Sequence, residues 1–313
     1  MKVVHLTAFG GPEVLRPAEV PDPQPRPGHV AVDLERAALN HRDVWIREGR
    51  PGPLPVVLGS DGAGVVAEVG AGVDGVAVGD EVVINPSLDW GDREDAPGPD
   101  FRILGVPDQG TYAERIVVAA HQVRPRPAGW SWDECAAFPL GGLTAWRALR
   151  LAGAAPGRRI LVTGAGGGVS TLLVQIGAAL GATIVATTGS DPKVARALEL
   201  GAAEAVDYHD PDWPRRIGPV HAAIDSVGGS GLDAVIGTLA RGGVLVTFGD
   251  TAREPAARPC RPSIRPPTAR SPTSLPPRPR TSTGPSGPRG RRSRRGGTST
   301  PTSAPASCCA WPS

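Results

Sequence analysis

Four glycines that follow a short apolar run are the residues whose types and spacing point most directly to chemistry. The run covers residues 160–163, and the glycines are Gly164, Gly166, Gly167 and Gly168. Glycine has no side chain to hold a bulky anion away from the backbone. Apolar residues at helical spacing follow, and a helix N-terminus offers free N–H groups and partial positive charge. The segment therefore predicts a strand, a turn and a helix that together bind a pyrophosphate.

The turn departs from the strict G-x-G-x-x-G spacing, which would need a glycine at Val169 or Thr171. It fits G-x-x-G-x-x-small, with Ser170 as the small residue. A tight turn without a ligand is the alternative interpretation. The complete strand–helix–strand context, which continues to Thr188, favours a dinucleotide site.

Strand-like and helix-like segments alternate from residue 160 onward. Asp191 as N-cap and Pro192 predict a helix over residues 191–200, and residues 231–240 predict another. Further strands are expected at residues 203–206, in the AAIDSVGG segment and at residues 244–249. Five strands alternating with helices predict an α/β fold with a parallel doubly wound sheet over residues 126–250, one strand short of the usual six.

Residues 1–125 are rich in Gly, Pro and Val, and their short apolar runs are broken by turn residues. This texture predicts a compact β-rich domain. Helices are expected at residues 38–48 and 133–151. Two domains of ordinary size suit the length of 313 residues.

Residues 251–313 differ in composition from the rest of the chain. They hold 12 of the 33 basic residues, 14 prolines and one acidic residue, Glu254, so the remainder is net acidic. Three of the four cysteines also lie there, which leaves Cys135 alone in the body and favours a reducing compartment. No apolar run is long enough to span a bilayer, and the N-terminus lacks the apolar stretch of a signal peptide, so we expect a cytoplasmic protein.

The alternating pattern stops near residue 250, and the residues beyond it are expected to be a disordered Pro- and Arg-rich tail. Two explanations are open. The tail could bind nucleic acid or another polyanion. Alternatively, the reading frame has slipped in a GC-rich gene, which we favour because the change falls inside an unfinished α/β pattern. No nucleic-acid partner is expected unless the tail is genuine.

Eight segments between residue 1 and about residue 250 follow one another in a recognisable order: PRPGHVAV, ALNHRDVWIREG, VVLGSDGAGVVAEVG, VGDEVV, GTYAERIVV, AAFPLGGLTAWRAL, the glycine turn and the stretch through DSVGG. Together they resemble the medium-chain dehydrogenase/reductase superfamily, in its zinc-free, quinone-oxidoreductase-like branch. The resemblance implies a GroES-like catalytic domain, a Rossmann domain and hydride transfer between a nicotinamide and a small-molecule substrate. It also implies a homodimer.

The positions that carry the catalytic zinc in zinc-dependent members of this family hold other residues here. They are Asn40, the Gly59, Ser60 and Asp61 triplet, and Leu140. Asn, Ser and Leu do not hold a tetrahedral zinc, and the lobe that elsewhere carries four cysteines has none. We therefore expect no metal site.

The resemblance also supplies candidate catalytic residues, which are Asn40, Asp43 and Arg47. Asn40 is expected to contact the substrate or the cofactor amide, and Arg47 to stabilise charge near the cleft. An i, i+4 helix pair is the alternative for Asp43 and Arg47. Without zinc, reduction of a quinone or enone is favoured over carbonyl reduction, which stays the alternative. An inactive or unstable product is a further alternative, because the family's sixth strand and return segment are missing.

NADPH is expected as the cofactor, with NADH less favoured. An NAD site usually carries an acidic residue at the end of the second strand, and this chain has none before Asp191. Lys193 and Tyr208 match positions near the 2′-phosphate in NADPH-using relatives, although Lys193 could be a solvated first-turn residue. Thr144 matches a cofactor contact, although a helix hydroxyl bonded to the backbone is the alternative. The full expected cofactor set is Asn40, Thr144, Gly164, Gly166, Gly167, Gly168, Val169, Ser190, Lys193 and Tyr208.

Overall fold

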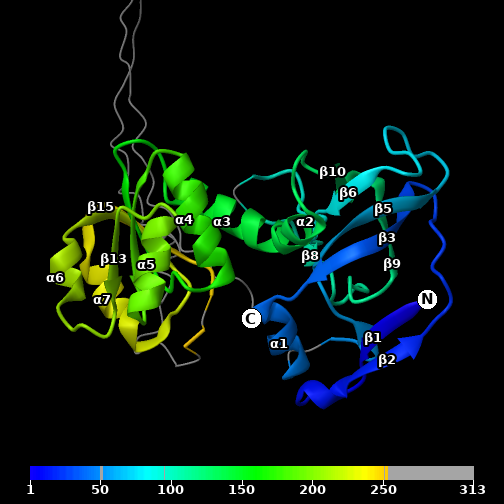
Figure 1. Ribbon diagram of the computed structural model, residues 1–313, viewed down its shortest axis with the longest axis horizontal. Helices are drawn as coiled ribbons and strands as arrows, with labels where there is room; N and C mark the ends of the chain where they lie inside the picture. Colours follow the sequence, from blue (N-terminus) through cyan, green and yellow to red (C-terminus); the bar gives the residue numbers. More distant parts are fainter. Residues whose placement is uncertain (50–51, 95, 250, 253–313) are drawn as a thin grey trace, which may run out of the picture.

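The computed structural model describes residues 1–49, 52–94, 96–249 and 251–252. Two lobes lie side by side, one built from the first part of the chain and the other from the second (Figure 1). Helices α2 (Trp132–Ala137) and α3 (Pro139–Leu151) lie between them. Among these residues, no helix is both long and apolar enough to cross a membrane.

The first lobe is built on antiparallel sheets. Its five-stranded sheet has the order β10-β6-β5-β3-β9, and a three-stranded sheet has the order β2-β1-β4. Alternate apolar residues such as Val30, Val32, Val66 and Ile84 form the core of the larger sheet. The strands are β1 (Lys2–Leu6), β2 (Leu15–Glu19), β3 (His29–Ala38), β4 (Val56–Val57), β5 (Asp61–Val69), β6 (Glu81–Ile84), β9 (Arg115–Ala119) and β10 (Val123–Pro125), with a separate pair β7 (Ser87–Leu88) and β8 (Arg102–Ile103).

Two helices complete this lobe. Helix α1 (His41–Arg47) follows β3 directly, and α2 packs against the larger sheet through Cys135 and Ala136, which contact Ala63. We predicted the boundary between the two domains at residue 125, so α2 lies after this boundary although it packs on the first lobe. Helix α3 packs into the core of the second lobe through Ala145, Ala148 and Leu149. Short 3₁₀ turns lie at Pro12–Val14 and Ala120–Gln122.

The second lobe is a parallel sheet with the order β13-β12-β11-β14-β15. Alternate residues of each strand point to opposite faces, so Ile160 and Val162 pack under α3 and α4 while Leu161 packs under α6 and α7. The elements are β11 (Arg159–Val162), α4 (Gly168–Ala179), β12 (Thr183–Thr188), α5 (Asp191–Glu199), β13 (Glu204–Asp207), α6 (Trp213–Ile217), β14 (Val220–Asp225), a 3₁₀ turn (Gly229–Gly231), α7 (Leu232–Gly237) and β15 (Leu239–Thr247).

The expected fold class is confirmed, since a β-rich lobe precedes a doubly wound parallel sheet. Three expected elements differ in detail. The helix expected at residues 133–151 is divided at Phe138, just before Pro139, which has no N–H to continue the ladder. Strand β15 begins at Leu239, so α7 is shorter than expected. Helix α5 has Ser190, not Asp191, as its N-cap.

The expected tail at residues 251–313 lies outside the described residues, apart from Thr251 and Ala252. Their backbone N–H groups donate to Ser226 and Val227 in the loop after β14.

Two helical glycines allow a direct test of the core of the second lobe. A Cβ on Gly177 of α4 would lie 2.5 Å from Cδ1 of Ile184 and 3.2 Å from Cδ2 of Leu149, and both side chains are fully buried. We expect Gly177→Ala to lower the free energy of unfolding by roughly 1–2 kcal/mol, because overpacking outweighs the gain in helix propensity. Urea denaturation measures this change.

The matched control is Gly237→Ala in α7, where nothing lies within 4 Å of a Cβ. This change should raise the free energy of unfolding by up to about 1 kcal/mol through helix propensity alone. Equal effects of the two substitutions would contradict the packing that the structure shows between α4 and β12.

Candidate active site

The glycine turn joins β11 to α4, as expected. Gly164 has a φ of 60°, and its carbonyl accepts a hydrogen bond from the N–H of Gly167 at 3.0 Å. Gly166, Gly167 and Gly168 are exposed, and Gly168 begins the helix. The first N–H groups of a helix have no intrahelical acceptor, so those of Gly168 and Val169 face the space above the turn. The turn therefore offers backbone donors and no side-chain obstruction to an anion.

Hydrogen bonds from the strand ends hold this turn in place. Ser170 Oγ donates to the carbonyl oxygen of Thr163 at 3.0 Å, and Thr163 Oγ1 donates to Asp225 Oδ1 at 2.6 Å. The other oxygen of Asp225 accepts from the N–H of Gly228 at 2.8 Å. A small, buried Ser170 lets α4 approach β11 closely, which explains why the missing final glycine of the motif is tolerated. The sequence analysis did not identify Asp225, although its position at the end of a parallel strand was a usable signal.

Lys193 lies over the glycine turn. A Cβ on Gly166 would lie 2.9 Å from Cδ and 3.3 Å from Nζ of Lys193, so the ammonium group is beside the turn although α5 carries it. Tyr208 lies similarly over Gly189, where a Cβ would be 2.4 Å from the tyrosine hydroxyl. Ser190 is the N-cap of α5, but its hydroxyl makes no capping hydrogen bond. The structure thus brings the glycine turn, Ser190, Lys193 and Tyr208 together at the carboxyl ends of β11, β12 and β13.

This arrangement fits the phosphates and ribose of a dinucleotide. Gly166, Gly167 and Gly168 are exposed, nothing lies within 4 Å of a Cβ on Gly168, and the helix N-terminus supplies N–H donors. Lys193 supplies a positive charge next to them. A solvated Lys193 without a role was the alternative, and its position over Gly166 favours the binding role.

Asp43 is the centre of a hydrogen-bond network at the start of α1. Its carboxylate accepts from the N–H of Asn40 at 2.9 Å, from the N–H of Gly59 at 3.3 Å and from the hydroxyl of Tyr112 at 2.7 Å. Burial and the Asp43 carboxylate raise the pKa of the Tyr112 hydroxyl above its ordinary value. Asp43 is itself buried, so the structure gives it a role in shaping the loop around Asn40.

Arg47 lies at the other end of α1. Its guanidinium donates to the carbonyl oxygen of Gly10 and pairs with Glu48 at 3.3 Å. Within the described part of the chain, no ion pair joins it to Asp43, so the alternative i, i+4 pair is not formed. About 10 Å of helix separates Arg47 from Asn40. The structure therefore does not bring Arg47 into contact with the other expected catalytic residues.

Thr144 lies in the second turn of α3, and its hydroxyl donates to the carbonyl oxygen of Leu140 at 2.8 Å. This is the helix-backbone bond that we weighed against a cofactor contact. A hydroxyl oxygen can still accept a hydrogen bond while it donates one. Its cofactor role stays a prediction.

Asp61 connects the two lobes, and the sequence analysis considered it only as part of a rejected zinc triplet. Its Oδ2 accepts from Nδ2 of Asn40 at 2.8 Å, and its Oδ1 accepts from the backbone N–H of Leu140 at 2.7 Å. Leu140 is in the first turn of α3, and Phe138, the N-cap residue of that helix, makes no side-chain capping bond. Asp61 therefore caps α3 from a strand that lies 79 residues earlier in the chain.

This carboxylate is costly to bury. Asp61 is 1% exposed, and among the described residues no Lys, Arg or His forms an ion pair with it. Burial raises its pKa from 3.8 to about 6, against the lowering effect of the bonds from Asn40 and Leu140, and Asp43 raises it further. The shift corresponds to roughly 3 kcal/mol. Because folding raises this pKa, the contribution of Asp61 to stability is greatest below pH 3.8 and is lost as the pH rises through about 6.

The residues at the expected zinc positions do not fit a metal. Asn40 donates to Asp61, Ser60 is buried with its hydroxyl donating to the carbonyl oxygen of Leu104 at 2.7 Å, and Leu140 has no ligand atom in its side chain. An amide nitrogen and a hydroxyl whose lone pairs are not directed together do not provide tetrahedral ligands. Across the residues that the structure describes, no group of three or more His, Cys, Asp or Glu side chains could hold a metal ion.

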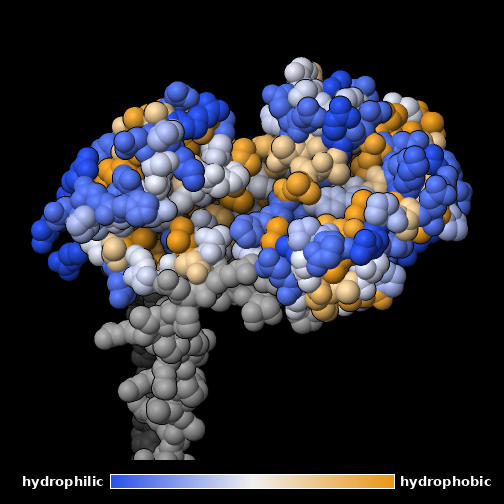
Figure 2. Space-filling model, turned by 60° about the horizontal axis from the view of Figure 1, so that its bottom comes forward, coloured by the Kyte–Doolittle hydropathy of each residue, from blue (hydrophilic) through white to orange (hydrophobic). Residues whose placement is uncertain are grey.

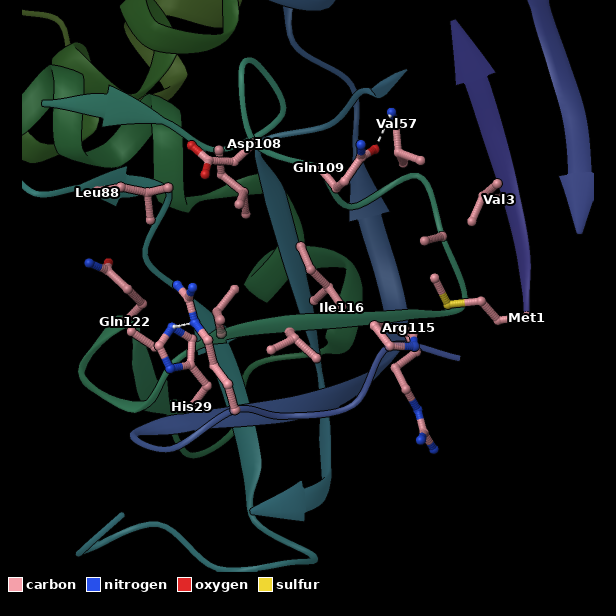
Figure 3. Close-up of a pocket in the computed structure, with 18 of the residues that line it drawn as sticks. Met1, Val3, His29, Val57, Leu88, Asp108, Gln109, Arg115, Ile116 and Gln122 are labelled. Carbon is pink, nitrogen blue, oxygen red and sulfur yellow. Dashed lines mark hydrogen bonds between the residues drawn. The ribbon is translucent and has the colours of Figure 1, made fainter. Parts of the chain in front are cut away.

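A cavity of about 680 Å³ lies elsewhere, in the first lobe (Figure 3). Residues that line it include Met1, Val3, His29, Arg115 and Gln122. None of the expected site residues borders it. By contrast, the space-filling view shows a notch between the two lobes, with hydrophobic side chains on its walls (Figure 2).

Comparisons with known proteins identify the families of both parts of the chain. Residues 26–128 match the alcohol dehydrogenase GroES-like domain family, and residues 168–265 match the zinc-binding dehydrogenase family. The chain is 37% identical over 257 residues to the zinc-type alcohol dehydrogenase-like protein YogA of Leptosphaeria maculans, covering 74% of this chain and 71% of that protein. It is 31% identical over 258 residues to quinone oxidoreductase 1 of Escherichia coli, covering 80% and 73%.

Solved structures give the same result. A crystal structure of a NAD-dependent alcohol dehydrogenase is 43% identical, with a TM-score of 0.76 over 82% of this chain and 80% of that one. The quinone oxidoreductase of Escherichia coli, solved in complex with NADPH, is 28% identical, with a TM-score of 0.70 over 82% and 76%. On these matches and on the two-lobed fold with its glycine turn, the chain belongs to the medium-chain dehydrogenase/reductase family of oxidoreductases.

Proposed function

We propose that this oxidoreductase uses NADPH to reduce a quinone, an enone or a related activated double bond, without zinc. The cofactor choice rests on the position of Lys193 over Gly166. Strand β12, which precedes the helix that carries Lys193, has no acidic residue. A lysine there pairs with a 2′-phosphate, whereas a ribose 2′-hydroxyl is usually bound by an acidic side chain.

The end of β12 supports this choice of cofactor. The strand ends at Thr188 and is followed by Gly189 and Ser190, so no acidic side chain stands directly at its end. Tyr208 lies over Gly189 and offers a hydroxyl to the same region. Since one relative is named a NAD-dependent enzyme and another binds NADPH, the residues around the turn decide between the cofactors.

The proposed substrate class follows from the chemistry of Asn40, Ser60 and Leu140, which offer no set of ligands for a tetrahedral zinc. A bound nicotinamide supplies the hydride, and the protein must position the acceptor and stabilise developing negative charge. Asn40 is our choice for the contact with the cofactor amide or the substrate, and Asp43 holds the loop that carries it. Arg47 remains a proposed source of positive charge near the cleft. A quinone or enone needs less polarisation than an isolated carbonyl, for which zinc is the usual Lewis acid.

Reduction of aldehydes or ketones is the second candidate. It is favoured by the relatives that are named alcohol dehydrogenases. We also propose a cytoplasmic homodimer. Polyanion binding by the basic tail, and loss of activity through a shifted frame, concern residues 251–313, of which the structure describes only two.

Replacement of Lys193 tests the cofactor assignment. We expect Lys193→Ala to raise the Kd for NADPH roughly 10- to 100-fold, because a charge-assisted hydrogen bond to phosphate is lost, and to leave the Kd for NADH almost unchanged. Fluorescence titration of both cofactors measures the two constants.

Arg196→Ala is the matched control, since Arg196 also lies on α5 but pairs with Glu199 at 2.9 Å on the exposed surface. It should leave both constants unchanged. An equal loss of NADPH and NADH affinity in Lys193→Ala would instead indicate that Lys193 binds the shared pyrophosphate.

The acceptor is tested by NADPH oxidation with a quinone, an enone and an aldehyde of similar size. We expect kcat/KM to be highest for the quinone or the enone and to be insensitive to prior treatment with a metal chelator, because no ligand set holds a catalytic zinc. Turnover confined to the aldehyde, or lost on chelation, would show the alcohol dehydrogenase-like reaction in its place.

A further inference from the structure

One side chain, that of Asp61, links Asn40 to the second lobe. Asn40 precedes α1 in the first lobe, while Leu140 begins the helix that packs into the core of the second. Asp61 bonds to both, at 2.8 Å to Nδ2 of Asn40 and at 2.7 Å to the N–H of Leu140. Its own carbonyl oxygen is held by the hydroxyl of Thr111 at 2.8 Å. The carboxylate therefore joins the two lobes at the residue expected to contact the ligand.

Only an ionised carboxylate satisfies both of these partners. The amide nitrogen of Asn40 and the backbone nitrogen of Leu140 are both donors, and each faces a different oxygen of Asp61. A protonated acid or an amide at position 61 would turn a donor toward one of them. A buried carboxylate without a cationic partner is retained here despite its cost, and its two bonds are made to groups of different lobes.

We propose that Asp61 is a positioning residue, which fixes the Asn40 carboxamide relative to α3 and thereby relative to the nicotinamide half of the cofactor site. The proposal rests on the function proposed above. It predicts that loss of either bond leaves intact the phosphate seat, by which we mean the glycine turn and Lys193. These residues lie at another part of the second lobe and do not contact Asp61. The hydride-transfer step should suffer, because the group at position 40 is then free to rotate.

The test uses Asp61→Asn, Asn40→Asp and the double variant in the full chain. In Asp61→Asn an NH₂ group faces a donor, and in Asn40→Asp two carboxylates face each other. The double variant restores the bond with donor and acceptor exchanged, while Oδ1 of the new asparagine still accepts from Leu140. We expect each single change to lower kcat roughly 10- to 100-fold and the double variant to recover at least about tenfold over either.

Two further measurements separate positioning from a general loss of structure. The Kd for adenosine 2′,5′-bisphosphate, which occupies only the phosphate seat, should be unchanged in all three variants. The wild-type kcat should fall as the pH drops through about 6, because Asp61 then takes up a proton. The titratable groups that face Asp61 are Asp43 and the Tyr112 hydroxyl. The Asp61→Asn variant should not show this fall of kcat at low pH. Asp33→Asn, an exposed carboxylate paired with Arg115, is the control and should behave as wild type.

The proposal is overturned if Asp61→Asn keeps the wild-type kcat, or if the double variant is no more active than the single variants. Loss of adenosine 2′,5′-bisphosphate binding in Asp61→Asn would overturn it in favour of a role in folding. Failure of the wild-type chain to bind NADPH or to reduce any acceptor would count against the proposed function itself, and these results are distinguishable.

Discussion

The hydrogen bond between Asp61 and the first turn of α3 joins the two lobes at the site. The end of a helix that is buried without acceptors is unstable, and α3 has no capping side chain of its own at Phe138. The acceptor comes from β5, in the sheet of the first lobe. A negative charge at this position is also favoured by the helix dipole, which offsets part of the cost of burying it. The helix that enters the second lobe is therefore oriented by a residue of the first.

A similar principle operates within the second lobe, where the ends of parallel strands supply the side chains that hold the glycine turn. Thr163 directly follows β11 and Asp225 ends β14, and the two strands are neighbours in the sheet. The hydroxyl of Ser170 closes the first turn of α4 onto the same strand. These bonds do not use the N–H groups of Gly168 and Val169 at the start of the helix, which stay available to a ligand. The anion site is thus built by backbone, and the polar side chains below it serve to keep that backbone fixed.

The parts of the fold that the sequence predicted are those that depend on local patterns. Apolar runs with intervening amphipathic helices led to the parallel sheet, and the glycines of residues 164–168 led to the turn. The break at Phe138 was missed because the helical pattern continues across it while the chain changes partner lobes. The early start of β15 was missed because pairing with β14, not the apolar pattern, extends the strand to Leu239.

The site residues, too, could be predicted from the sequence only where a local pattern marks them. Lys193 could be proposed from the sequence because the resemblance to NADPH-using relatives points to its position, and the structure places it over Gly166. Asp61 could not, because its partner Leu140 is remote in the sequence and donates from the backbone, so no side-chain pattern marks it. Asp43 and Arg47 suggested a helix pair by spacing, yet burial directs Asp43 to Tyr112 and Gly59 instead. Contacts between distant segments decide these roles, and they follow only from the folded chain.

The three positions that could have carried zinc illustrate why a metal site and this network exclude each other. A zinc ligand must direct a lone pair at the metal. Here the amide of Asn40 donates to Asp61, the hydroxyl of Ser60 donates to Leu104, and the contribution of Leu140 is its N–H. All three positions therefore act as hydrogen-bond donors. The buried carboxylate of Asp61 accepts hydrogen bonds from two of them, Asn40 and Leu140. The charge buried between these two positions is therefore the negative charge of Asp61.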